Sequence, residues 1–178
     1  MRYIIKTFDQ KNLVSAKFSV VEVYKSVYSL APYNEPASQI ESFSTSWETR
    51  TKKNGFLFVG AEDEAKKLVG FAYGWKSISG DSWNMKLSAR LGELSAHWLS
   101  DCFEFVDLAV IPSVQGVGLG RDLTKELFAQ VNAKTAILLT HQTTTKASEM
   151  YLRNGWIQLS NNFEVAPGKL YQVMGKTL

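Results

Sequence analysis

The segment from Phe103 to Asn132 joins a buried strand, a glycine-rich turn and a helix, and this order constrains the fold more than any other feature of the chain. Residues 103–111 (FEFVDLAVI) are almost continuously apolar, which is typical of a central strand covered on both faces. Pro112 ends this strand. Glycines follow at positions 116, 118 and 120, and a helical spacing of apolar residues begins at Leu119. The sequence therefore predicts a central strand that leads through a tight turn into a helix.

A turn of this kind is suited to hold an anion. The first turn of a helix has unpaired N–H groups and a partial positive charge. Glycines let the backbone approach a diphosphate closely, because they have no Cβ atom. Arg121 adds a cation in the first helical turn. A Walker loop would need Lys-Ser or Lys-Thr after the glycines, and a dinucleotide fingerprint would need a glycine at Leu123; the sequence has neither.

Strand and helix patterns alternate along the rest of the chain. They predict strands at 3–8, 55–61, 67–78, 103–111, 136–140, 156–159 and 170–174, and helices at 15–30, 36–53, 119–132 and 146–153. Residues 79–101 are expected to form a partly helical insertion, with one apolar face made by Met85, Leu87, Leu91, Leu94 and Trp98. No break in composition indicates a second domain. We therefore expect a single domain over residues 1–178, with a mixed sheet and helices on its faces.

Two motifs resemble those of the GNAT superfamily of N-acetyltransferases. The first joins Leu108-Ala109-Val110, at the end of the central strand, to Gln115-x-x-Gly118-x-Gly120. The second runs from Ala147 through Tyr151 to Gly155-Trp156. Both occur in the family's order and at its separation. The resemblance implies an α/β (mixed α+β) fold with a mixed, mostly antiparallel central sheet, splayed at the acetyl-CoA site and covered by helices on both faces.

The resemblance also implies acetyl-CoA as the co-substrate, with no metal. The backbone of the strand would bond to the pantetheine arm, and the N–H groups of the turn would hold the pyrophosphate. Thr144 stands where the family often has asparagine, and a threonine hydroxyl could still bond to the cofactor or cap the helix. The expected cofactor-binding residues are Leu108, Val110, Gln115, Gly116, Val117, Gly118, Leu119, Gly120, Arg121, Thr144, Ser148 and Tyr151.

In this family the amine attacks the thioester directly, without an acyl-enzyme. Tyr151 matches the position of the usual general acid, and a phenol with an ordinary pKa of about 10 is protonated and able to donate at neutral pH. Glu104 lies where some members carry a catalytic glutamate, and Asp107 is a second candidate base. The sequence leaves open whether Glu104, Asp107 or water removes the proton.

The acceptor is expected to be the primary amine of a small molecule. The loop between the first two helices commonly borders the acceptor site in this superfamily, and here it contains Tyr33 and Glu35 as substrate-binding candidates. A carboxylate at position 35 would attract a cationic amine. A protein N-terminus or a lysine side chain is an alternative acceptor. A non-catalytic module that binds or senses acyl-CoA is the alternative to an enzyme.

The formal charge of +3 is modest, and the densest basic runs, Lys52-Lys53 and Lys66-Lys67, fall at predicted turns. Nucleic acid is therefore not expected as a partner. The sequence has neither an apolar run of about 18 residues nor a signal-peptide pattern, so we expect no membrane partner and a cytoplasmic location.

Cys102 is the single cysteine and is expected to be a buried or indifferent thiol. His97 and His141 are too isolated to suggest a metal site. The oligomeric state is left open, with a homodimer as one option.

Overall fold

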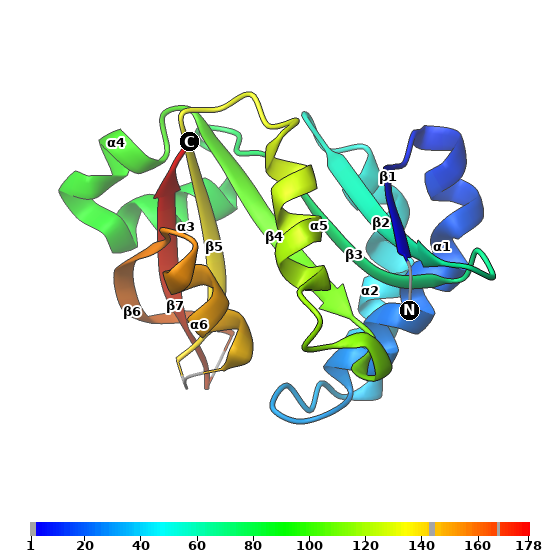
Figure 1. The fold of residues 1–178 in the computed structure, drawn as a ribbon. Coiled ribbons are helices and arrows are strands. Elements are labelled where there is room, and N and C mark those ends of the chain that lie inside the picture. Colours follow the sequence, from blue (N-terminus) through cyan, green and yellow to red (C-terminus); the bar gives the residue numbers. More distant parts are fainter. Residues whose placement is uncertain (1–2, 143–144, 167) are drawn as a thin grey trace. The chain divides into compact units, whose positions relative to one another are not determined.

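The structure is a computed structural model that describes residues 3–142, 145–166 and 168–178. Seven strands are hydrogen-bonded in the order β1-β2-β3-β4-β5-β7-β6. The β4–β5 pair is parallel, and the β1–β2, β2–β3, β5–β7 and β6–β7 pairs are antiparallel. The predicted mixed, mostly antiparallel sheet is therefore confirmed. In chain order (Figure 1) the elements are β1 (Tyr3–Thr7), α1 (Gln10–Tyr28), α2 (Ala37–Thr51), β2 (Leu57–Asp63), β3 (Leu68–Lys76), α3 (Ser82–Leu91), η1 (Gly92–Leu94), α4 (Ser95–Trp98), β4 (Cys102–Val110), η2 (Pro112–Val114), α5 (Leu119–Phe128), β5 (Thr135–His141), α6 (Lys146–Arg153), β6 (Ile157–Ala166) and β7 (Lys169–Thr177).

The chain forms two compact units. The first comprises Met1–Gly74 and Asp107–Val131, and the second comprises Trp75–Val106 and Asn132–Leu178. Strands β3 and β4 each contribute residues to both units.

In the first unit, α1 and α2 pack on one face of the strands and α5 packs on the other (Figure 1). Trp47 of α2 is buried, and its ring meets Phe58 of β2 and Tyr73 of β3 edge-on, with centroids 5.7 and 5.9 Å apart. On the opposite face, a Cβ atom at Gly70 would lie 3.2 Å from Leu123 of α5 and 2.9 Å from the carbonyl oxygen of Ala109. Only glycine lets β3 and its neighbours come this close.

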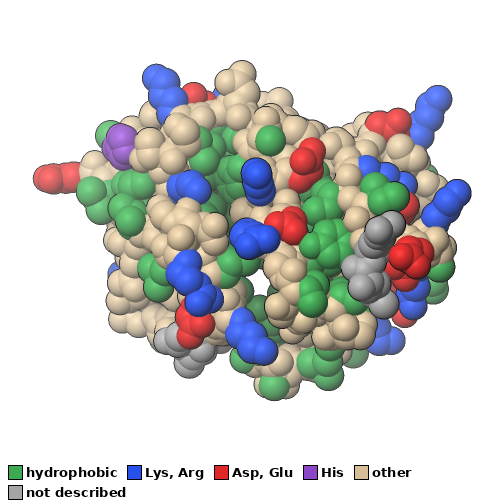
Figure 2. All heavy atoms as spheres, viewed as in Figure 1, with side chains coloured by type: hydrophobic (Ala, Val, Ile, Leu, Met, Phe, Trp, Pro, Cys, Tyr) green, Lys and Arg blue, Asp and Glu red, His purple; other side chains and the backbone are tan. Residues whose placement is uncertain are grey.

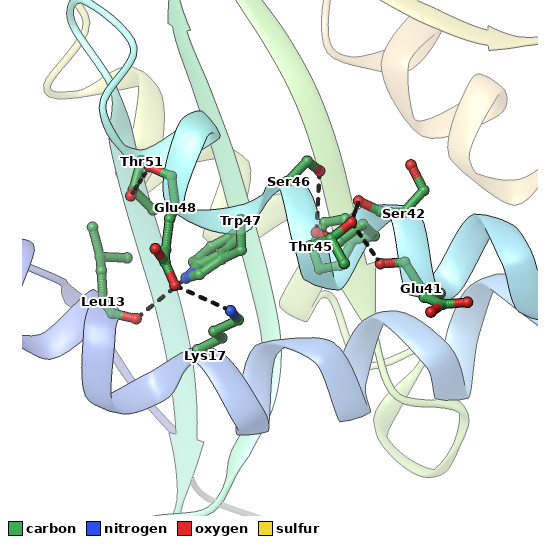
Figure 3. A network of polar contacts seen from close by, with 10 residues as sticks. Leu13, Lys17, Glu41, Ser42, Thr45, Ser46, Trp47, Glu48 and Thr51 are labelled. Atoms are coloured by element: carbon green, nitrogen blue, oxygen red, sulfur yellow. Dashed lines mark hydrogen bonds and ion pairs between the residues drawn. The ribbon is translucent and has the colours of Figure 1, made fainter.

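Helix α1 begins at Gln10, so the predicted start at Ser15 is wrong by five residues. The carboxylate of Asp9 accepts a hydrogen bond from the N–H of Asn12 over 2.8 Å and caps the helix earlier than the apolar spacing suggests. Helices α1 and α2 are joined by the indole of Trp47, which donates to the carbonyl of Leu13 over 3.3 Å (Figure 3). An exposed ion pair between Lys17 and Glu48 accompanies this contact but adds little stability.

In the second unit, α3 and α4 cover one face of β5, β7 and β6, and α6 covers the other (Figure 1). The predicted helical insertion is confirmed, but two members of its apolar stripe are wrong: Met85 is 57% exposed and Leu94 is 49% exposed. Gly92, with φ 56°, ends α3, so the helical phase is not kept through the segment. The buried cluster under these helices contains Leu87, Leu91, Trp98, Leu99, Cys102, Ile137, Phe163 and Val173.

Two further element ends differ from the sequence-based expectation by four residues or more. Helix α5 ends at Phe128 rather than Asn132, and β6 extends to Ala166 rather than ending at residue 159. The pairing of β6 with β7 shifts register at three places, and Asn162 has φ 54°. These bulges interrupt the alternation of apolar and polar residues along β6, so the sequence does not show the pattern of a long strand there.

Candidate active site

The glycine-rich turn lies in the first unit, between the end of β4 and the start of α5. Gly116 has φ 83° and Gly118 has φ 92°, a region that disfavours residues with a Cβ atom. Gly118 is the N-cap of α5. A glycine N-cap has no side chain to bond with the first N–H groups of the helix, so an external anion can take that place.

Two polar side chains of the turn bond within the protein. The side-chain amide of Gln115 donates to the carbonyl oxygen of Val110 over 2.8 Å. The guanidinium of Arg121 bonds to Oδ1 of Asp122 at 3.0 and 3.1 Å. Asp122 also accepts from the hydroxyl of Tyr3 over 2.8 Å, and this bond contributes most to lowering the pKa of Asp122 and to raising that of Tyr3. The charge of Arg121 is therefore shared with a carboxylate.

The last residues of β4 present two carbonyl groups away from β3. Ile111 donates its N–H to the carbonyl of Val69 on β3 over 3.0 Å. Because backbone groups of successive residues point to opposite edges of a strand, those of Val110 point away from β3. These outward groups belong to Val110 and Leu108. Their carbonyls accept from Gln115 and from the hydroxyl of Tyr28, the latter over 3.2 Å. They are the two backbone positions that the sequence assigned to the pantetheine arm.

Strand β4 contains one residue more than β3 over the stretch that they share. Ser77 donates to the carbonyl of Cys102 over 2.9 Å, and Ile111 donates to Val69 over 3.0 Å. Nine residue steps separate Cys102 from Ile111, whereas eight separate Val69 from Ser77. One unpaired residue on β4 is the signature of a β-bulge, which bends a strand and re-aims its side chains.

Asp107 lies in a polar cluster of the first unit that the sequence did not reveal. The hydroxyl of Tyr73 donates to Oδ2 of Asp107. Arg50 donates to the oxygen of Tyr73 over 3.0 Å and to Ser46 over 2.9 Å. Burial raises the pKa of the Asp107 carboxyl, against the charge of Arg50 and the hydrogen bonds from Tyr73 and Tyr28, which lower it. Burial, followed by the charge of Asp107, raises the pKa of Tyr73 well above its ordinary value.

The predicted acceptor residues Tyr33 and Glu35 belong to this neighbourhood. Burial raises the pKa of Tyr33, and the negative charge of Asp107 raises it further. The charge of Glu35 in turn raises the pKa of Asp107. The ring of Tyr28 lies 4.9 Å from that of Tyr33. The structure thus brings two carboxylates and two phenols together.

Glu104 lies in the second unit and is 6% exposed. Its Oε2 accepts a hydrogen bond from the indole Nε1 of Trp75 over 2.9 Å. It is also the last β4 residue in the ladder with β5, which pairs Cys102 with Thr135, Phe103 with Ala136 and Glu104 with Ile137. The buried carboxylate therefore sits where this parallel pairing ends.

Tyr151 lies on α6 in the same unit and is 7% exposed. Its ring packs against Phe105 and Trp156, with centroids 6.0 and 5.8 Å away. Ser148 and Thr145 form a capping box at the start of α6, in which each hydroxyl accepts from the other residue's N–H, over 2.8 and 3.0 Å. Thr144 is outside the described residues.

Glu104 and Tyr151 lie on opposite faces of the second unit's strands. Phe105 contacts Tyr151 on the α6 face, and its neighbour Glu104 must point the other way because side chains alternate along a strand. Two residues before Glu104, Cys102 belongs to the buried cluster under α3 and α4. The candidate base and the candidate acid therefore approach from two sides.

Basic and acidic side chains are interspersed over the face shown in Figure 2. Among residues 3–142, 145–166 and 168–178, no group of three His, Cys, Asp or Glu side chains is arranged to hold a metal ion. None of the helices formed by these described residues is long and apolar enough to cross a bilayer.

Comparison with known proteins decides the family. The model of the "Acetyltransferase (GNAT) family" matches residues 20–156, which include the turn, Glu104 and Tyr151. The chain belongs to the GNAT acetyltransferase family. The predicted resemblance is confirmed, and the family to which the chain belongs is one of acetyltransferases.

A GCN5-like protein acetyltransferase of Mycobacterium tuberculosis is 26% identical to the GNAT chain over 128 residues. The match covers 66% of the chain and 62% of that relative, so about three fifths of the relative's length is spanned.

Among solved structures, PaiA N-acetyltransferase from Thermoplasma acidophilum in complex with coenzyme A gives a TM-score of 0.61 at 18% identity, with 100% of both chains covered. A mosquito arylalkylamine N-acetyltransferase-like protein gives a TM-score of 0.70 at 15% identity, with 99% of this chain and 100% of that chain covered. At these identities the likeness shows the fold.

Proposed function

We propose that this GNAT enzyme moves an acetyl group from acetyl-CoA to the primary amine of a small molecule, and that its two compact units act as one catalytic domain. The observation that carries the proposal is the glycine N-cap of α5, which follows a β4 edge with two outward carbonyls. N–H groups at the helix start suit a pyrophosphate. The outward carbonyls of Leu108 and Val110 suit the amide N–H groups of pantetheine.

The diphosphate of the cofactor would bind at the glycine-rich turn of the first unit. The backbone from Gln115 to Arg121 would hold the diphosphate, with Gly116, Val117, Gly118, Leu119 and Gly120 supplying the close approach. Ser148 stands at the start of α6, and its hydroxyl would need to leave the capping box, or to use its remaining lone pair, to reach the cofactor. The complex of PaiA with coenzyme A supports the choice of ligand.

Catalysis would proceed by direct attack of the free amine on the carbonyl carbon of the thioester. Glu104 would accept the proton that the ammonium loses before or during attack. The C–S bond of the tetrahedral adduct then breaks, and the sulfur takes a proton from Tyr151. The second proton, which the nitrogen loses as the amide forms, returns through solvent to the phenolate of Tyr151, and Glu104 releases the first proton to solvent. The placement of Glu104 and Tyr151 on opposite faces of the strands supports this division, because the amine and the leaving sulfur need separate proton partners.

Asp107 is the weaker candidate for the base. Tyr73 already donates to its carboxylate, and the charge of Arg50 favours its ionised form. Burial nevertheless raises the pKa of Asp107 overall, and what counts against it as the base is that Tyr73 already occupies one of its carboxylate oxygens. Together with Glu35 and Tyr33, Asp107 is better suited to attract a cationic acceptor. Water remains the alternative base.

A protein acceptor is the second candidate, because the curated relative in Mycobacterium tuberculosis is named a protein acetyltransferase. The deciding experiment incubates the enzyme with acetyl-CoA and either small primary amines or peptides with a free N-terminus or lysine, and follows release of the CoA thiol. We expect turnover with small amines. Turnover with peptides alone would move the proposal to protein acetylation. CoA binding without turnover on any acceptor would contradict the proposed reaction.

The role of Tyr151 is tested in the same assay. Tyr151→Phe should lower kcat about 100-fold, near the lower end for loss of one general acid. The KM for acetyl-CoA should change little, since the ring keeps its contacts with Phe105 and Trp156. A normal kcat would show that Tyr151 serves packing alone.

A further inference from the structure

We infer that Trp75 is a positioning residue for Glu104, holding the carboxylate in the orientation and protonation state that a base requires. The inference deepens the proposed function and rests on the assignment of Glu104 as the base. Trp75 lies near the end of β3, where the second unit's part of that strand begins. The structure gives its indole a specific partner.

Two contacts fix the relation between the end of β3 and the start of β4 in the second unit. Ser77 donates its N–H to the carbonyl of Cys102 over 2.9 Å. Lys76 pairs with Asp101 at 2.9 Å. Moving two residues along each antiparallel strand from Ser77 and Cys102 places Trp75 opposite Glu104, with both side chains on the same face. The hydrogen bond between them, 2.9 Å from Nε1 to Oε2, is the direct consequence.

The chemistry of the pair follows from burial. A carboxylate with 6% exposure loses most of its hydration, which disfavours the charged form unless a donor replaces water. An indole N–H can only donate, so it satisfies one oxygen of Glu104 without competing for its proton. Trp75 therefore selects an ionised, fixed carboxylate.

The groups that neighbour Glu104 in the second unit include the Cys102 thiol and the ion pair between Lys76 and Asp101. Burial raises the pKa of the Cys102 thiol to about 12, so this neighbour is neutral over the working pH range. Asp101 is compensated by Lys76. On the α3–α4 side the cluster that contains Cys102 is apolar, and from β5 the partner of Glu104 is Ile137. His97 on α4 is exposed and His141 is on β5, and Glu104→Gln serves as the control that isolates the contribution of Glu104.

The first test uses nuclear magnetic resonance and needs no activity. The indole ¹H–¹⁵N resonance of Trp75, assigned by its loss in Trp75→Phe, should shift with pH as Glu104 titrates. The shift should vanish in Glu104→Gln. An indole resonance of Trp75 that is independent of pH in the wild-type protein, while the other resonances show a folded chain, would overturn the inference.

The second test compares pH profiles of kcat/KM. Trp75→Phe keeps an aromatic ring but removes the donor, and it should lower kcat about tenfold and move the acid limb up by about one pH unit, with KM for acetyl-CoA unchanged. Glu104→Gln should lower kcat about 100-fold and remove the limb. Trp83→Phe is the matched control, because Trp83 packs edge-on against Phe163, and it should behave like the wild-type enzyme.

The outcomes separate the two proposals. A wild-type rate and a wild-type acid limb in Glu104→Gln would show that Glu104 is not the base. The pH-dependent shift of the Trp75 indole resonance would then show only that the hydrogen bond between Trp75 and Glu104 exists. A large effect of Glu104→Gln together with a wild-type acid limb in Trp75→Phe would keep the base and overturn the positioning role.

Discussion

The side-chain amide of Gln115 donates a hydrogen bond to the carbonyl oxygen of Val110 over 2.8 Å. This bond spans the short helix η2 and joins the end of β4 to the turn that precedes α5. Arginine is commoner than glutamine at this position in the motif. In this chain the residue holds its own turn in shape, so its contribution to cofactor binding is expected to be indirect.

Gln115→Ala should weaken CoA binding about two- to tenfold, because the turn loses one neutral hydrogen bond with a net value of about 0.5–1.5 kcal/mol. Gln130→Ala is the matched control, since Gln130 also donates its amide to a backbone carbonyl, that of Glu126 over 3.1 Å, at the far end of α5. Calorimetric titration with CoA gives both affinities. Equal Kd values for Gln115→Ala and the wild type would show that the bond does not shape the turn.

Tyr73→Phe should lower the free energy of unfolding by about 1–3 kcal/mol, because Arg50 and Asp107 each lose a partner in a buried setting. Tyr3→Phe removes the bond to Asp122 at a more exposed position and should cost below about 1 kcal/mol. Urea denaturation of both variants measures the difference. Similar small losses would mean that the Asp107 cluster adds no more than a surface bond.

The local parts of the fold were predictable because their signals lie close together in the sequence. Helix α6 spans Lys146–Arg153 as predicted, since Thr145 caps its start and Asn154-Gly155 ends it. The turn at Gly116 and Gly118 was also predicted, because glycine is the residue that accepts a positive φ without strain.

The partners of the site residues were not predictable. Asp107 and Tyr73 are 34 residues apart, and Glu104 and Trp75 are 29 apart. A single sequence contains no local signal for such pairs, since strand register and the bulge on β4 decide them. The start of α1, by contrast, did have a local signal, because Asp9 is a favourable N-cap residue. The prediction followed the apolar spacing from Val20 onward and so placed the start too late.

The thiol of Cys102 should make the stability of the protein depend on alkaline pH. Burial raises its pKa to about 12 in the folded protein, whereas an unfolded cysteine ionises near pH ~8.5. Because the folded pKa is raised, this contribution to stability is fully present below pH ~8.5 and is lost as the pH rises towards ~12, at up to about 1.4 kcal/mol per pH unit.

Cys102→Ala removes that dependence. Its free energy of unfolding should fall less steeply than that of the wild type between pH ~9 and ~11. The tyrosines contribute equally to the pH dependence of both proteins, so the difference between the two curves is due to the thiol. Parallel curves for the two proteins would mean that the thiol is not shielded in the fold.

In the proposed function the backbone at the start of α5 holds the diphosphate of acetyl-CoA, and calorimetric titration of Gly118→Glu with CoA measures whether it does. Gly80→Ala is the control for backbone strain, because Gly80 also has a positive φ, 81°, and has nothing within 4 Å of its added Cβ position. Both variants should lose about 1–2 kcal/mol of stability from the left-handed conformation. Gly80→Ala should bind CoA as the wild type does, and Gly118→Glu should show no binding although it remains folded. Wild-type affinity in folded Gly118→Glu would contradict the account.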